Sequence, residues 1–176
     1  MLRLSWAAVL ALPLPALQDP ASDPPRTEVA VVTSASNPAE GLSLAELRRY
    51  LLLERRKWPE GARVVLLLRP GGTPGQTLFL KIVRMDARHL HRHWVGLVNR
   101  GLLRSLPSTV RDPALIARVL ERAPGGLTLL DASQVPEGLK VLRVDGRLPG
   151  EEGYPLRLGA EDLAAWKPRK EAPLTP

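Results

Sequence analysis

Residues 63–77 read Arg-Val-Val-Leu-Leu-Leu-Arg-Pro-Gly-Gly-Thr-Pro-Gly-Gln-Thr. The run at 63–68 is almost continuously aliphatic, which predicts a strand buried on both faces of a sheet. Two glycines then provide a turn, and Thr73 stands where a helix N-cap is expected, with Pro74 in the first helical position. A buried strand that leads through glycines into a capped helix is the building unit of α/β folds.

The same alternation of strands and helices continues on both sides of this stretch. Further strands are predicted at 28–33, 127–130 and 139–144, with a weaker candidate at 154–158. Helices are predicted where a capping residue precedes an amphipathic segment, after Ser43, Asp86 and Asp112. Strands that alternate with helices predict a mainly parallel sheet with helices on both faces.

The two ends of the chain differ from this α/β pattern. Residues 1–16 combine an early arginine with an apolar run and a small residue for cleavage, which predicts a signal peptide and a periplasmic or secreted protein. The alternative, a buried first helix, lacks an amphipathic pattern, and the run is too short to span a bilayer. Residues 17–27 are predicted to be a Pro-rich linker, 28–166 the α/β domain and 167–176 a disordered tail. We expect no membrane span after cleavage.

The 176-residue chain has no cysteine and a formal net charge of +7. The lack of cysteine excludes disulfides and a lipid-modified N-terminal cysteine. A positive surplus can indicate nucleic acid or another anion as the partner. However, only 4% of the residues are aromatic, and the basic residues are scattered apart from Arg48-Arg49 and Arg55-Arg56-Lys57. Because stacking platforms for bases are few, we expect no nucleic-acid partner and a solvated basic surface.

The turn at 69–76 is the strongest candidate binding site in the sequence. Free amides at a helix N-terminus favour an anion, and the arginine could add a bidentate contact. The predicted anion-binding residues of this turn are Arg69, Gly72, Thr73, Gly75 and Gln76. Ser34 and Ser36 follow the first strand and are expected at the same edge of the sheet, where α/β sheets commonly bind ligands. The alternative is an ordinary strand-to-helix turn, with serines that bond their own backbone.

All three histidines lie within residues 89–93, and His89 and His93 share one face of a helix. They are weak candidates for metal binding because a structural zinc site has four ligands, and His93 could instead pack at the edge of the core. The sequence has no nucleophile elbow, no paired-carboxylate motif and no Cys–His pair. We therefore expect no enzymatic activity, no cofactor and no metal.

Several stretches, taken in order, resemble one known family. Residues 29–38, 42–50 and 57–61 match a strand that ends near Asn-Pro, a Leu-Ser-x-x-Glu-Leu helix and a Trp-x-x-Gly turn. Residues 93–101 and 123–130 add a His-Trp-Val-Gly segment and a Pro-Gly-Gly-Leu strand entry. Together they resemble the short phosphate ABC transporter substrate-binding-like proteins. This resemblance implies a small periplasmic-binding-protein-like (type II) domain of the α/β class.

The candidate site departs from that family's pattern. Full-length phosphate-binding members carry an Arg-Ser-Asp-Gly-Ser-Gly-Thr loop, whereas this chain keeps Arg69, has Thr73 in place of the serine, and has Pro74 and Gly75 in place of Gly-Thr. The resemblance implies an exported, non-catalytic protein that binds phosphate or another small oxyanion and works with an ABC transporter permease. The alternative is an envelope protein-interaction module that retains the fold but has lost the ligand site.

Overall fold

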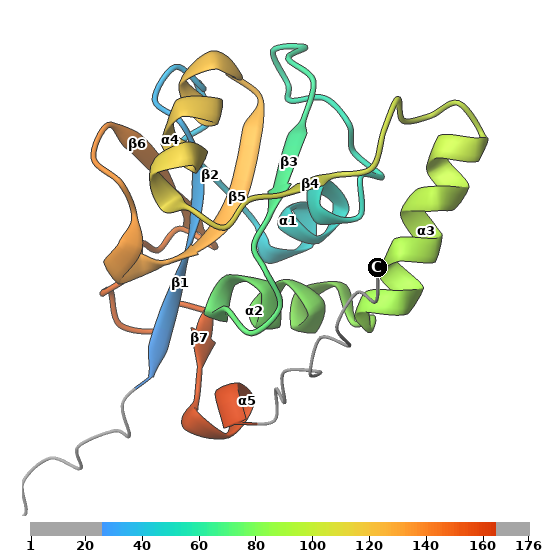
Figure 1. The fold of residues 1–176 in the computed structure, drawn as a ribbon. Helices are drawn as coiled ribbons and strands as arrows, with labels where there is room; N and C mark the ends of the chain where they lie inside the picture. Colours follow the sequence, from blue (N-terminus) through green and yellow to red (C-terminus); the bar gives the residue numbers. More distant parts are fainter. Residues whose placement is uncertain (1–25, 165–176) are drawn as a thin grey trace, which may run out of the picture.

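The first predicted strand forms the middle of the sheet. In the computed structural model, which describes residues 26–164, β1 (Thr27–Ser34) lies between β6 (Leu139–Val144) and β5 (Gly126–Asp131). The order across the seven-stranded sheet is β2-β6-β1-β5-β3-β4, and β7 pairs with the start of β1 (Figure 1). The remaining strands are β2 (Gly41–Leu42), β3 (Val65–Leu68), β4 (Ser108–Thr109) and β7 (Arg157–Leu158). The signal peptide predicted at 1–16, most of the linker and the tail predicted at 167–176 lie outside the described residues.

The strands of the sheet share one direction, with β1 as the exception. β2 is parallel to β6, and β3 is parallel to both β4 and β5. β1 is antiparallel to each of its partners, β5, β6 and β7. The predicted mainly parallel α/β sheet is therefore confirmed. However, the carboxyl end of β1 lies beside the amino ends of β5 and β3. Leu127, near the start of β5, pairs with Thr33, near the end of β1, on one side and with Leu66, near the start of β3, on the other.

The helices begin where the sequence predicts their caps. They are α1 (Leu44–Leu51), α2 (Pro74–Val83), α3 (Ala87–Asn99) and α4 (Pro113–Arg122). Each is preceded by a residue whose side chain accepts a hydrogen bond from a first-turn amide: Ser43, Thr73, Asp86 and Asp112 respectively. A short 3₁₀ turn, η1 (Ala132–Gln134), follows β5, and α5 (Ala160–Ala164) follows β7.

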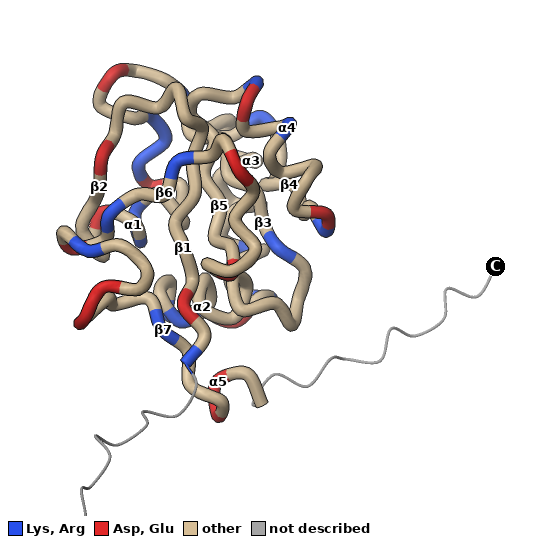
Figure 2. The backbone as a smooth tube through the Cα atoms, turned by 90° about the vertical axis from the view of Figure 1, so that its left-hand side faces the viewer, with Lys and Arg blue, Asp and Glu red and all other residues tan. Residues whose placement is uncertain are grey.

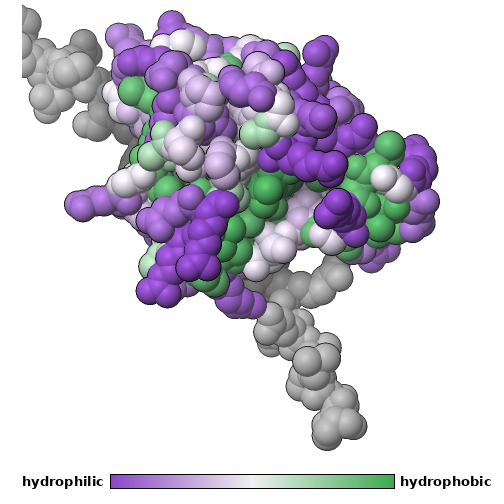
Figure 3. All heavy atoms as spheres, turned by 90° about the horizontal axis from the view of Figure 1, so that it is seen from above, coloured by the Kyte–Doolittle hydropathy of each residue, from purple (hydrophilic) through white to green (hydrophobic). Residues whose placement is uncertain are grey.

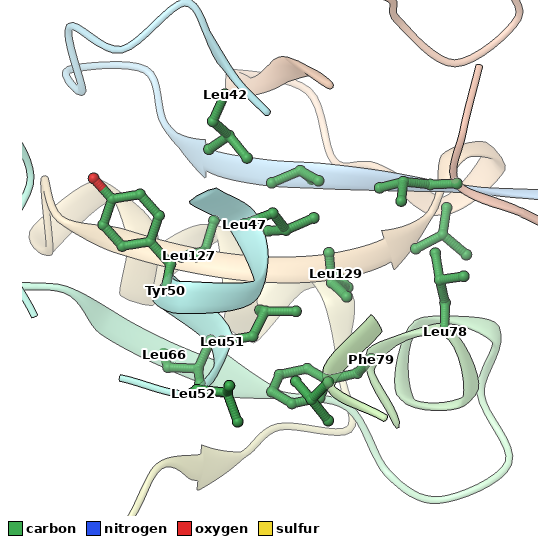
Figure 4. Close-up of a cluster of buried hydrophobic side chains, with 14 of the residues drawn as sticks. Leu42, Leu47, Tyr50, Leu51, Leu52, Leu66, Leu78, Phe79, Leu127 and Leu129 are labelled. Atoms are coloured by element: carbon green, nitrogen blue, oxygen red, sulfur yellow. The ribbon is translucent and has the colours of Figure 1, made fainter. Parts of the chain in front are cut away.

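The core consists of two hydrophobic clusters, one on each face of the sheet. β1 shows this division directly: Val29 and Val31 belong to one cluster, whereas Ala30 and Val32 belong to the other. The larger cluster packs α1, α2 and α3 against the sheet, and Figure 4 shows side chains of α1 and α2 meeting Leu127 and Leu129 of β5. The smaller cluster lies under α4. Because both faces are covered, the continuous apolar pattern of these strands is explained.

Charged residues of both signs share the surface beside β6 and β7. Figure 2 shows lysine and arginine interspersed with aspartate and glutamate on this side of the molecule. Three ion pairs lie here, namely Lys140 with Glu40, Arg143 with Glu151 and Arg157 with Glu28. Within residues 26–164, no helix has the length and apolar character needed to cross a membrane.

Candidate anion-binding site

Three helical segments begin at the same edge of the sheet. β3, β4 and β5 are parallel, so their carboxyl ends lie together, and α2, α4 and η1 follow them. Ligands of α/β proteins commonly bind at this kind of edge, where the strands end and helix N-termini begin. Asp112 caps α4 and Asp131 caps η1, so each of these two N-termini already holds a carboxylate. α2 differs, because its cap is the neutral Thr73 and its first turn contains no acidic residue.

The turn that enters α2 is held by hydrogen bonds around Thr73. Its backbone amide and its hydroxyl both donate to the carbonyl oxygen of Pro70, at 3.3 and 2.9 Å. The same hydroxyl oxygen accepts from the amide of Gln76 at 3.3 Å. Gly72 has a φ of 86°, in the left-handed region that glycine adopts without strain. The turn therefore presents the partial positive charge of the α2 N-terminus without a carboxylate of its own.

Gly75 brings the first turn of α2 against the sheet. It is buried, and a Cβ added at this position would clash with the carbonyl group of Leu129 in β5. The glycine is thus needed for close approach of two backbones, and not for ligand contact alone. This approach fixes α2 relative to the carboxyl edge of the sheet.

Arg69 links β3 to the segment that enters α4. Its side chain is buried, and Nη1 donates to the carbonyl oxygens of Val110 at 2.8 Å and Arg111 at 2.6 Å. Burial lowers the pKa of the guanidinium from its ordinary value, while the Asp112 carboxylate acts in the opposite direction. Among the described residues, Nε and Nη2 of Arg69 have no hydrogen-bond partner. Since arginine stays protonated in proteins, part of its donor fork remains available beside the turn.

Two buried polar atoms in the first turn of α2 have no hydrogen-bond partner. They are Oε1 of Gln76 and Oγ1 of Thr77, and the described part of the chain contains only one more, Nε1 of Trp94 in α3. Buried polar groups are nearly always hydrogen-bonded, so two unpartnered atoms beside a helix N-terminus that has no carboxylate call for an explanation. Sequence analysis selected Gln76 but not Thr77, although both lie in the quoted stretch, because unsatisfied hydrogen bonds are visible only once the helix is packed.

Ser34 and Ser36 are not part of this arrangement, and the prediction that they share an edge with Arg69 is wrong. β1 runs opposite to β3, so the residues that follow β1 lie at the amino edge of the sheet (Figure 1). Their hydroxyl oxygens are 2.9 Å apart, and the Ser34 oxygen also accepts from the amide of Ser36. These serines satisfy local groups, which was the alternative interpretation.

The histidines also have local partners. Nδ1 of His89 lies 2.8 Å from the Asp86 carboxylate, and Nε2 of His93 lies 2.9 Å from the carbonyl oxygen of Leu52. His93 therefore faces the edge of the core, while His89 is exposed at the start of α3. In the portion of the chain from 26 to 164, no group of three metal-ligating side chains converges.

The fold is similar to that of solved phosphate-transport receptors. A scan against protein-family models gives no match, and neither does a search of curated proteins. A protein assigned as a phosphate ABC transporter substrate-binding protein from Clostridium perfringens, solved with bound phosphate, superimposes with a TM-score of 0.59 at 18% identity, over 78% of this chain and 57% of that one. PstS from Borrelia burgdorferi gives a TM-score of 0.57 at 14% identity, over 76% and 55% of the two chains.

An ABC-type phosphate transport receptor from Vibrio cholerae gives a TM-score of 0.55 at 10% identity, over 70% of this chain and 48% of that one. The chain thus spans about half the length of the solved proteins it matches. At these identities the likeness concerns the fold, and it confirms the periplasmic-binding-protein-like α/β class.

Proposed function

We propose that this protein is a non-catalytic, exported binding protein for a small oxyanion, with phosphate as the first candidate. The observation that carries the proposal is the first turn of α2, where Gln76 and Thr77 bury polar atoms without partners next to a helix N-terminus without a carboxylate. An oxyanion at this position would accept a hydrogen bond from the Thr77 hydroxyl, which otherwise has no partner. Oε1 of Gln76 is itself an acceptor, so Gln76 would donate through Nε2. The solved neighbour with bound phosphate supports the same class of ligand.

Each group of the proposed site has a definite role toward the anion. The hydroxyl of Thr77 and the side-chain amide of Gln76 would donate to it, as would the free amide of Gly75 in the first turn. Arg69 would add positive charge through the part of its guanidinium that Val110 and Arg111 do not occupy. Gly72 and Thr73 shape the turn that exposes these donors. An ABC transporter permease is the partner we propose for delivery of the anion.

The proposal is tested by calorimetric titration of phosphate and sulfate into the wild-type protein and the double variant Gln76→Leu/Thr77→Val. Hydrogen bonds to a charged group contribute about 1.5–3 kcal/mol each, so we expect phosphate affinity to fall by about tenfold or more. The double variant should stay folded, because the polar side-chain atom of Thr77 and those of Gln76 donate no hydrogen bond and accept none within the described chain, except that Thr73 caps the backbone amide of Gln76, which the variant keeps. Arg92→Gln, an exposed substitution on α3, serves as the control.

Equal phosphate affinity in the wild-type protein and the double variant would contradict the site, and no response to any oxyanion would contradict the function. Arg69 is less suitable as the first test. Its guanidinium holds the carbonyl groups of Val110 and Arg111, so its replacement changes the fold as well as the site.

A further inference from the structure

A groove of about 880 Å³ opens along the outer side of β3. Its walls are the segment after α1, at 53–57, and the loop between α3 and β4, at 101–107, with the first residue of β4, while residues 63–67 form its floor. Figure 3 views this end of the molecule and shows hydrophobic surface gathered in a hollow that hydrophilic residues border. The groove lies toward the amino end of β3, whereas the α2 turn follows its carboxyl end.

Most of the large exposed hydrophobic side chains in the described part of the chain lie in this groove. Residues 26–164 contain five large hydrophobic side chains that are markedly exposed, and three of them line this groove: Val65 at 40%, Leu102 at 43% and Leu106 at 37%. Single exposed apolar residues are normal on a protein surface, but clustered ones indicate an interaction site. The clustering therefore distinguishes this groove from the rest of the described surface.

The same groove carries a strong excess of positive charge. Its lining includes one carboxylate, Glu54, against five basic residues: Arg55, Arg56, Lys57, Arg63 and Arg104. Arg55 pairs with Glu46 at 3.2 Å, whereas the other four basic side chains form no ion pair with a carboxylate of the described chain. The basic residues beside β6 and β7 differ, because acidic neighbours pair with them there. The groove thus selects an occupant with both negative charge and apolar groups.

The shape of the groove favours an extended chain as that occupant. β4 pairs with Leu67 and Leu68, and residues 56 and 57 pair with residues 64 and 63, so a short stretch at Val65 and Leu66 borders the groove without a partner from either wall. Exposed sheet edges commonly receive extended peptides, with alternate side chains in adjacent pockets. A concave trough with cations on both walls fits a segment laid along it better than it fits a flat bilayer surface.

We propose that this groove binds an acidic, partly apolar peptide segment of a partner protein, laid along β3 between Arg104 on one wall and Lys57 on the other. Val65, Leu102 and Leu106 contact the apolar side chains of the segment, and the unpaired arginines and lysine contact its carboxylates. Because this surface is separate from the α2 turn, the protein can hold an anion and a protein partner at once.

The test is fluorescence anisotropy with a labelled peptide of sequence Asp-Leu-Glu-Ser-Val-Asp-Leu-Glu, and with the same peptide carrying lysine at each acidic position. We expect the acidic peptide to bind, more weakly as salt is raised, and the basic peptide not to bind. Lys57→Glu/Arg104→Glu should weaken binding by about tenfold, since both side chains are exposed and their reversal turns attraction into repulsion. Arg118→Glu/Arg122→Glu, a matched reversal on exposed positions of α4, should leave it unchanged.

Leu102→Ser gives an independent readout, because it removes an exposed apolar contact without a change of charge and should also weaken the acidic peptide. An equal loss in the α4 control, equal binding of both peptides, or no binding of the acidic peptide would overturn the proposal.

Vesicles of phosphatidylglycerol and phosphatidylcholine are titrated in parallel. Vesicle binding that depends on Lys57 and Arg104, without peptide binding, would assign the groove to a membrane surface and would also overturn it.

Discussion

The two edges of the sheet both gather polar side chains, but they differ in how those side chains are satisfied. At the amino edge, Nδ2 of Asn37 donates to Oγ1 of Thr33 and to the carbonyl oxygen of Pro124, and its Oδ1 accepts from the amide of Ala39. The Thr33 hydroxyl in turn donates to the carbonyl oxygen of Gly126. At the carboxyl edge, Gln76 and Thr77 bury polar atoms that have no such partner.

This difference separates structural polar residues from candidate ligand-binding ones. A saturated network stabilises the fold and leaves nothing for a ligand to satisfy, whereas the unpartnered Thr77 hydroxyl beside a helix N-terminus is available to donate to an anion. Substitutions at the amino edge should therefore change stability and leave anion binding intact. Substitutions of the unpartnered groups should do the reverse.

The largest effect on stability is expected from Asn37→Ala. The variant removes all three hydrogen bonds of the Asn37 side chain, to the Thr33 hydroxyl, the Pro124 carbonyl and the Ala39 amide, so we expect the free energy of unfolding to fall by about 3 kcal/mol. Urea unfolding measures this change, and phosphate affinity of the folded variant should match the wild type. A loss of phosphate affinity with unchanged stability would reverse the assignment of the two edges.

A smaller effect is expected from Gly75→Ala. The added Cβ meets the backbone of Leu129, so α2 must shift away from β5, which should lower the free energy of unfolding by about 2 kcal/mol. Gly96→Ala is the matched control, since this glycine lies within α3 and nothing lies near the added Cβ. Alanine is the better helix former, so the control should gain about 0.5–1 kcal/mol. Equal behaviour of the two variants in urea would contradict the close packing of α2.

The smallest effect on stability is expected from Gln76→Leu and Thr77→Val, each tested alone. The atoms removed make no hydrogen bond, and the replacements keep a similar volume, so we expect changes within about 0.5 kcal/mol. The informative quantity is the difference between these changes in the free energy of unfolding and the change for Asn37→Ala. If thermal unfolding showed a loss as large as that of Asn37→Ala, the two side chains would be structural, and the contrast between the edges would fail.

Sequence analysis predicted the parts of this fold that depend on local signals. Continuous aliphatic runs gave the buried strands, and Ser43, Thr73, Asp86 and Asp112 marked the helix starts, because capping depends on neighbours within one turn. The direction of β1 was not predictable in this way. It depends on which distant strands pair with β1, and an error in that direction moved Ser34 and Ser36 to the wrong edge.

The candidate sites were predictable only in part. Arg69 and the α2 turn were found because a strand, glycines and a cap are adjacent in the sequence. Nη1 of Arg69 donates to the carbonyl groups of residues 110 and 111. These hydrogen bonds join residues about forty positions apart, so local sequence patterns could not predict them. Likewise, the run Arg55-Arg56-Lys57 was interpreted as a solvated surface, because only the fold brings Arg104 and the exposed leucines of the α3–β4 loop to it.

The most direct test of the central claim is a titration of phosphate into ¹⁵N-labelled protein, followed by amide chemical shifts. We predict saturable shifts for the amides of Gly72, Thr73 and Gly75–Thr77, at the start of α2, and none for Ser34–Asn37 at the end of β1. Such a result would place the anion at the unsaturated edge of the sheet. Shifts confined to Ser34–Asn37, or no saturable shift at any amide, would contradict the account.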